Sequence, residues 1–112
     1  MTNKAVEMSI EPGAESLILA MGRKMRTKAR SKVLDRAITH LREQEAVSDV
    51  AAWFSEPRFA PSRRTTVRLS PENARFADTM AAMAGRGRPA ILLDMVYMAA
   101  AKMQAEDFEA LR

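Results

Sequence analysis

One pattern occurs twice in this sequence, the second time 59 residues after the first and without a gap over about 35 residues. Each occurrence has alternating apolar residues, then a proline before a helical pattern, then a second helical pattern. One copy alone would leave a strand edge unpaired and could not bury a core, so we expect the two copies to pair within one chain. The offset superposes Ile10 on Leu69, Pro12 on Pro71 and Asp35 on Asp94.

The periodicity of the apolar residues gives the expected elements. Alternation predicts short strands at 5–10 and 64–69, which should pair in antiparallel fashion. The segment from Ser48 to Phe54 is expected to form one or two helical turns, with Ser48 as N-cap and with Trp53 and Phe54 packed inward. Helical spacing predicts four main helices, which run from Pro12 to Met25, from after Thr27 to about Glu45, from Pro71 to the Gly85/Gly87 turn, and from about Pro89 to Met103.

These elements predict a mainly α fold with two short antiparallel strands and four main helices. The two copies should cover about residues 4–45 and 63–104, joined by a linker at 46–62 that contains Pro57 and Pro61. A chain of 112 residues is of ordinary size for one domain, so we expect residues 1–112 to form a single domain built from two repeats.

Composition excludes several classes of function. The chain has no cysteine and one histidine, which leaves no residues for a disulfide, a thiol nucleophile or a multi-histidine metal centre. No catalytic grouping of serine, histidine or carboxylate residues stands out, so we expect no enzyme activity and no cofactor. The sequence shows no signal peptide and no apolar run long enough for a membrane span, and we expect a soluble, cytoplasmic protein.

The positive charge is concentrated in particular stretches. The chain carries 18 Lys and Arg against 14 Asp and Glu, a formal net charge of +4. Most of the cations fall in three runs, at 23–36, 58–68 and 86–88, while the end of the chain is acidic. Each run alone is typical of a solvated face, but three in so short a chain favour a basic surface for a polyanionic partner.

The second copy has a distinctive order of motifs. It contains Arg64-Thr65-Thr66-Val67-Arg68-Leu69-Ser70-Pro71-Glu72, a helix, Gly85-Arg86-Gly87-Arg88-Pro89 and an apolar helix from Ala90. In these residues it resembles the ribbon-helix-helix DNA-binding family of the MetJ, Arc and CopG type. The resemblance covers the first copy less well, because Arg26 stands where the family commonly has a turn glycine. Two copies in one chain are similar to the tandem arrangement of TraY-type conjugation accessory proteins.

The resemblance implies a tandem ribbon-helix-helix fold, that is, one intrachain pseudo-dimer whose two-stranded ribbon enters the major groove of double-stranded DNA. The residues that would read bases are Arg64, Thr66 and Arg68 from the second strand and Ala5, Glu7 and Ser9 from the first. The residues that would bind phosphates are Lys4, Thr27, Lys28, Arg30, Arg63, Gly87 and Arg88. Because the two strands differ, the bound site should be asymmetric.

Several alternatives remain open at the level of sequence. The DNA-binding protein would be a transcriptional repressor or a plasmid-transfer (relaxosome) accessory factor, monomeric or assembling further on DNA. The other reading is an antitoxin-like protein-interaction module whose acidic segment, Glu106 to Arg112, binds an unknown protein partner. Alternating Arg and Thr is also common on any solvated strand. Thr27 could be only a helix N-cap.

Overall fold

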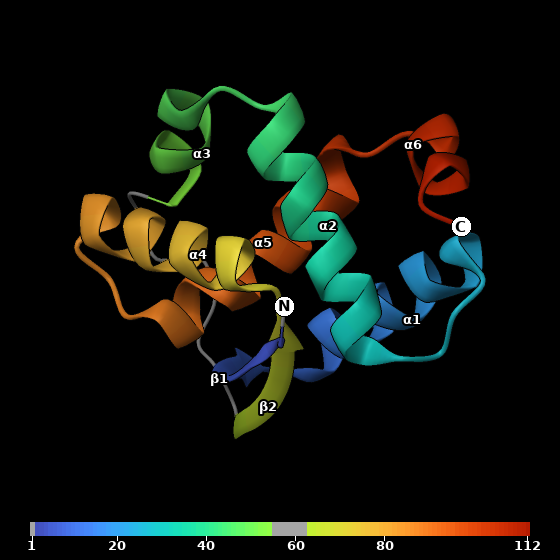
Figure 1. Cartoon of the computed structure of the whole chain (residues 1–112), viewed down its shortest axis with the longest axis horizontal. Helices are drawn as coiled ribbons and strands as arrows, with labels where there is room; N and C mark the ends of the chain where they lie inside the picture. The colour runs from blue at the N-terminus through green and yellow to red at the C-terminus, as the bar shows by residue number, and fades with distance from the viewer. Residues whose placement is uncertain (1, 55–62) are drawn as a thin grey trace.

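The computed structural model describes residues 2–54 and 63–112. Within these ranges the chain is mainly helical, with one two-stranded antiparallel sheet (Figure 1), as the sequence predicts. Pro57 and Pro61 of the expected linker lie outside the described residues. The elements in chain order are β1 (Lys4–Ile10), α1 (Pro12–Met25), α2 (Arg30–Gln44), α3 (Val47–Phe54), β2 (Arg63–Leu69), α4 (Pro71–Ala84), α5 (Arg88–Lys102) and α6 (Ala105–Ala110).

The register of the sheet is centred on the pair Glu7 and Thr66. The 59-residue offset also superposes these two positions. The pairing register is therefore symmetric about this central pair, so that each strand extends equally far on both sides of it. On one face of the sheet the alternating apolar residues are buried, among them Met8 and Val67. The other face, which carries Glu7 and Thr66, is called the outer face below.

The helices of each half cover the strand of the other half. α2 packs against β2, α5 packs against β1, and α2 and α5 also pack against each other. Figure 1 shows the sheet at the lower edge of the molecule with the helices gathered on one side of it. Neither half could bury its own strand without the other, which explains why one core extends through both.

A short third helix follows each helical pair. α3 packs against α4, and α6 packs against α1, so each lies on the first helix of the opposite half (Figure 1). Val50 of α3 and Phe108 of α6 are buried at these contacts. The helical turns predicted from Ser48 to Phe54 are confirmed by α3, although this segment falls within the predicted linker at 46–62. α6 was not predicted. Ser48 was also the wrong N-cap, because α3 starts at Val47 and the Ala46 carbonyl accepts the first helical hydrogen bonds.

The first helix of each half ends in the same way. Arg26 (φ 59°, ψ 44°) and Gly85 (φ 65°, ψ 33°) both adopt the left-handed conformation. The following residue donates its N–H to an equivalent carbonyl, from Thr27 to Gly22 at 2.9 Å and from Arg86 to Ala81 at 3.0 Å. The turn glycine that the first copy lacks is therefore replaced by an arginine in the same geometry. A left-handed residue with a Cβ costs about 1–2 kcal/mol relative to its usual conformation.

One cation from the basic runs is used inside the protein. The Arg86 guanidinium forms an ion pair with Asp94 and donates to the Phe54 carbonyl at 3.1 Å. The side chains of Arg86 and Asp94 are 12% and 0% exposed. Asp35, which the offset superposes on Asp94, instead accepts the Ser70 N–H at 2.8 Å at the start of α4. Arg86 therefore belongs to the core and not to a basic surface.

A carboxylate and a phenol join the start of α1 to α5. Glu11 caps α1 by accepting the N–H of Ala14 at 2.7 Å and of Gly13 at 3.1 Å, and it also accepts the Tyr97 hydroxyl. A Cβ on Gly13 would lie 2.6 Å from the Tyr97 oxygen, so glycine permits this close approach. The hydrogen bond from Tyr97 lowers the pKa of Glu11. Burial and the bond to Glu11 raise the pKa of Tyr97 to about 12.

We expect the only tyrosine of the chain to ionise near pH 12 in a titration of its near-ultraviolet absorbance. Because the folded pKa lies above the ordinary value of 10.0, this group stabilises the fold below that pH, and the contribution is lost as the pH rises through 12. Glu11→Gln should move the midpoint back toward 10, since it removes the carboxylate. A midpoint that is the same in Glu11→Gln and in the parent chain would contradict the coupling.

Candidate nucleic-acid interface

The outer face of the sheet exposes two arginines of β2, Arg64 and Arg68. Cross-strand neighbours on this face are Ala5 with Arg68, Glu7 with Thr66, and Ser9 with Arg64. All of these except Ser9 are exposed. One arginine therefore stands at each end of the face, both supplied by β2. Whether these side chains read bases stays a prediction.

Ser9 does not fulfil its predicted role as a base reader in this structure. Ser9 pairs with Arg64 and so lies on the outer face as predicted, but the residue is only 1% exposed. Its hydroxyl has no hydrogen-bond partner among the residues that the structure describes. The alternation of the strand gives the direction of a side chain, but burial also depends on the atoms around it, and here they cover the short serine side chain.

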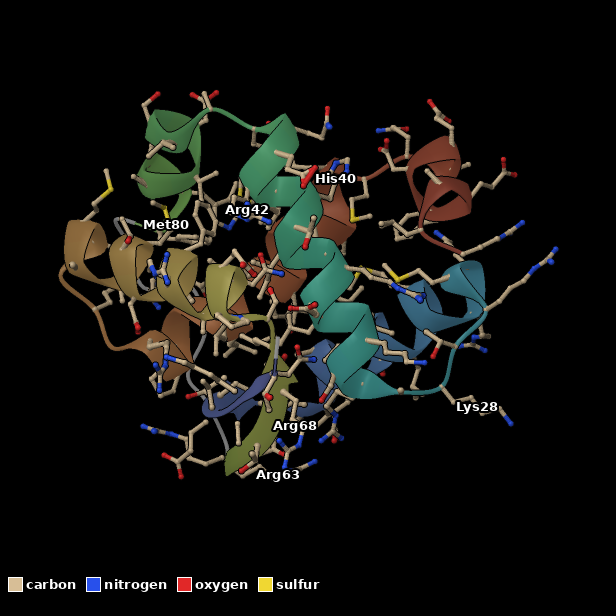
Figure 2. The ribbon with its side chains drawn as sticks, in the orientation of Figure 1. Lys28, His40, Arg42, Arg63, Arg68 and Met80 are labelled. Atoms are coloured by element: carbon tan, nitrogen blue, oxygen red, sulfur yellow. The ribbon has the colours of Figure 1, made fainter. Side chains whose placement is uncertain are left out.

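The two arginines of the face differ in their surroundings. Arg64 lies 3.8 Å from the Glu7 carboxylate, in a pair whose side chains are both more than half exposed. Arg68 has no ion-pair partner within the described ranges, and its backbone N–H donates to the Ser31 hydroxyl at 2.9 Å. The strand is thereby fixed to the first turn of α2 while the Arg68 guanidinium stays free. Figure 2 shows Arg63 and Arg68 together at the sheet, with Lys28 projecting outward from the turn before α2.

The second helix of each half, α2 or α5, begins without a side-chain cap. The N-caps of α2 and α5 are Ala29 and Gly87, and no side chain accepts their first N–H groups. By contrast, Glu11 and Ser70 cap α1 and α4. Uncapped N–H groups and the positive end of the helix dipole suit an anion such as a phosphate.

Thr27 is not the N-cap that one reading of the sequence suggested. α2 starts at Arg30, two residues later than a Thr27 cap would require, and the Thr27 hydroxyl accepts the Ala29 N–H at 3.2 Å. Thr27 therefore orders the turn before the helix. Its hydroxyl hydrogen is still available for a ligand.

Several of the predicted phosphate-binding cations have acidic partners. Arg30 contacts Glu15 at 3.1 Å and donates to the Thr65 hydroxyl at 3.0 Å, and Arg63 shares the same carboxylate. Arg88 pairs with Asp78 at 3.0 Å. Lys4 and Lys28 are exposed and have no ion pair in the described part of the chain. The side chains of these ion pairs are partly exposed to solvent, so each pair contributes little, on the order of 1 kcal/mol, and a DNA phosphate can replace the carboxylate.

Glu15 is the site residue that sequence reasoning missed. It joins α1, the start of α2 and the start of β2, because Arg30 and Arg63 both contact its carboxylate. No local pattern could have shown this, since Arg63 lies 48 residues further along the chain. The effect is to fix the start of β2 to the uncapped end of α2.

The described residues contain no group of three or more histidine, aspartate or glutamate side chains that could hold a metal ion. None of the helices in the described ranges has the length and hydropathy needed to cross a bilayer. No protein-family model matches the chain, and neither a curated protein nor a solved structure is significantly similar to it.

Proposed function

We propose that this chain is a tandem ribbon-helix-helix protein that binds double-stranded DNA sequence-specifically through the outer face of its two-stranded sheet. The observation that carries the proposal is the outer face itself, which exposes Arg64, Thr66 and Arg68, while α2 and α5 pack against the strands that form it. The central pairing of Glu7 with Thr66 and the crossed covering of β1 and β2 support the fused pseudo-dimer.

The dimensions of this face suit a major groove. The groove of B-form DNA is about 12 Å wide and admits a two-stranded ribbon. Arg64 and Arg68 are four residues apart on one strand, which places them about 14 Å apart at ~3.4 Å per residue. They can therefore each bond bidentately to a guanine about four base pairs apart, with Thr66 between them against a base edge or a thymine methyl group. Glu7, opposite Thr66, can accept from the amino group of a cytosine.

The uncapped helix ends supply contacts to the DNA backbone. The bond from the Arg68 N–H to Ser31 shows that the first turn of α2 lies beside one end of the outer face. The N–H groups of that turn, with Lys28 close by, would clamp a phosphate, and α5 with Gly87 and Arg88 would do the same at the other end. Phosphate contacts give affinity and register, while the sheet residues give sequence preference.

The two ends of the outer face offer different groups. At one end Arg68 is free and faces the small Ala5, and at the other end Arg64 is held by Glu7 beside the buried Ser9. The bound site is therefore asymmetric, and the protein binds it in one orientation. Such a protein would act as a repressor or as an accessory factor at a transfer origin.

The acidic end of the chain supports DNA binding over the antitoxin-like alternative. Phe108 is 3% exposed, and Arg112 donates to the Lys24 carbonyl at 2.8 Å. Lys24 also lies over the Phe108 ring, 4.9 Å from its centroid. The segment that would have to wrap a partner is thus packed against α1 of its own chain.

Selection of bound sequences from a random pool of duplexes tests the proposal. We expect one asymmetric motif that contains guanines about four base pairs apart, and an affinity that falls steeply with salt, by ~0.9 log units per phosphate contact for each tenfold increase in salt. Single-stranded DNA of the same sequence serves as the control and should bind weakly. Failure to enrich any motif, together with an affinity that does not depend on salt, would refute DNA binding.

A further inference from the structure

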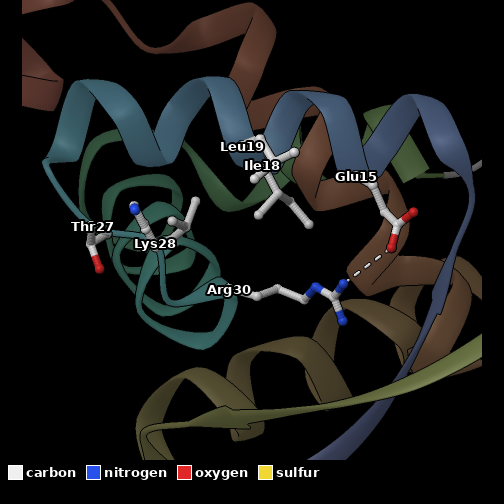
Figure 3. Close-up of a pocket in the computed structure, with 7 residues that line it drawn as sticks. Glu15, Ile18, Leu19, Thr27, Lys28 and Arg30 are labelled. Atoms are coloured by element: carbon white, nitrogen blue, oxygen red, sulfur yellow. Dashed lines mark hydrogen bonds and ion pairs between the residues drawn. The ribbon is translucent and has the colours of Figure 1, made fainter.

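A pocket of about 300 Å³ lies between α1 and the turn that leads into α2. Its apolar lining includes Ile18 and Val33, which are 4% and 1% exposed, and Leu19, which is 60% exposed. Thr27 and Lys28 line the same pocket. In Figure 3 these two residues lie at one end, the Arg30–Glu15 ion pair lies at the other end, and Ile18 and Leu19 lie between them.

The equivalent position in the second half is arranged differently. The 59-residue offset superposes Leu19 on Asp78, and Arg30 and Arg88 are both the first residue of their helix. Asp78 and Arg88 form an ion pair at 3.0 Å that joins α4 to α5. In the first half a leucine replaces that acid, and Arg30 turns instead to Glu15 and Thr65. The exposed Leu19 therefore borders an open pocket in the first half. At the equivalent place in the second half, the ion pair of Asp78 and Arg88 links the two helices.

The charges around the pocket favour an anion at its Lys28 end. Lys28 has no ion pair in the part of the chain described, and α2 begins there without a side-chain cap. The one carboxylate of the pocket, Glu15, is already shared by Arg30 and Arg63. A cationic head group would therefore meet unpaired positive charge, whereas a carboxylate would meet Lys28, the free Thr27 hydroxyl hydrogen and backbone N–H groups.

We infer that this pocket binds a small carboxylate with a short apolar tail, the carboxylate at Lys28 and the tail against Ile18, Leu19 and Val33. The volume of the pocket lies at the lower end of the range for small-molecule sites, which suits a ligand of this size. The ligand would sit at the end of α2 that the proposed function assigns to a DNA phosphate. It would therefore compete with DNA and act as a releasing effector, a consequence that rests on the proposed function.

Binding is tested on the full chain without DNA, with hexanoate as the probe and amide chemical shifts as the readout. We expect saturable shifts at Leu19 and Lys28, and none with hexylamine at the same concentrations. Leu19→Asn should weaken hexanoate binding about tenfold, because the tail loses its exposed apolar contact. Met83→Asn is the matched control, since Met83 is another exposed apolar residue, 54% exposed on α4. Equal binding by the two variants, equal shifts with hexylamine or no saturable shifts would overturn the inference.

A second arm separates this inference from the proposed function. At a hexanoate concentration about nine times its Kd for the parent chain, binding of the selected duplex should weaken about tenfold in the parent chain and in Met83→Asn, but only about twofold in Leu19→Asn. If the parent chain binds hexanoate but binds no duplex, the proposed function is wrong, while the inference that the pocket binds a carboxylate is supported. If duplex affinity is the same with and without bound hexanoate, DNA binding stands and the role as effector is overturned.

Discussion

Replacing Arg86 with glutamine is expected to lower the free energy of unfolding by about 3–5 kcal/mol, the usual loss when one partner of a buried ion pair is removed. The Asp94 carboxylate is fully buried, and Arg86 is its ion-pair partner. Glutamine also loses the bond to the Phe54 carbonyl, which holds the end of α3. Urea unfolding followed by circular dichroism gives the difference in free energy, with the fluorescence of Trp53, the only tryptophan, as a second probe.

Two further variants show whether the buried charge is the cause. Arg75→Gln makes the same chemical change at an exposed position of α4 and should alter stability by no more than about 0.5 kcal/mol. The double variant Arg86→Met, Asp94→Leu removes both charges and should recover most of the stability that Arg86→Gln loses. A loss in Arg86→Gln no larger than that in Arg75→Gln would show that the ion pair contributes nothing to the fold.

The double variant Arg64→Ala, Arg68→Ala is expected to bind the selected duplex about 100-fold more weakly or worse, since each bidentate contact to guanine is worth about 1–3 kcal/mol. Affinity for a scrambled duplex should fall much less, because the helix ends and Lys28 still bind phosphates. Fluorescence anisotropy at one fixed salt concentration measures both affinities. This prediction rests on the proposed function. The expected result would show that the sheet recognises the base sequence of the duplex.

Comparison of the single variants sharpens the test. Arg68→Ala should lose more affinity than Arg64→Ala, because Arg64 must first leave Glu7 before it can bind a base. The control is Arg75→Ala, Lys102→Ala, which removes two positive charges from exposed positions outside the sheet. If this control weakens selected and scrambled duplexes as much as the sheet variant does, net charge and not base reading explains the effect.

The regular elements could be predicted from the sequence because their signals are local. Alternation defined both strands to within one residue, and Pro12 and Pro71 marked where α1 and α4 begin. The end of α1 at Met25 was also predicted correctly, although the left-handed residue that follows it, Arg26, is not the glycine that usually marks such an end. α6 is six residues long, too short for a clear periodic pattern, and it is stabilised by packing on α1.

The candidate site was only partly predictable, since contacts between distant residues determine its charges. The exposed arginines of β2 followed from strand alternation alone. The pairing of Arg63 and Arg30 with Glu15, and of Arg86 with Asp94, required the helices to be in place. For the same reason a run of basic residues in the sequence overstated the free positive charge near the turn at Gly85. The burial of Ser9 likewise depends on what surrounds the strand.

The central pairing of the sheet has a consequence for how such a chain can diverge. When two identical chains form a two-stranded sheet about a twofold axis, the residue at the centre faces its own copy. Glu7 in that arrangement would stand opposite another Glu7, and like charges directly across a sheet are destabilising. Fusion of the halves lets Glu7 face Thr66 instead. A single polypeptide can therefore carry an acid at the one position where a symmetric dimer would select against it.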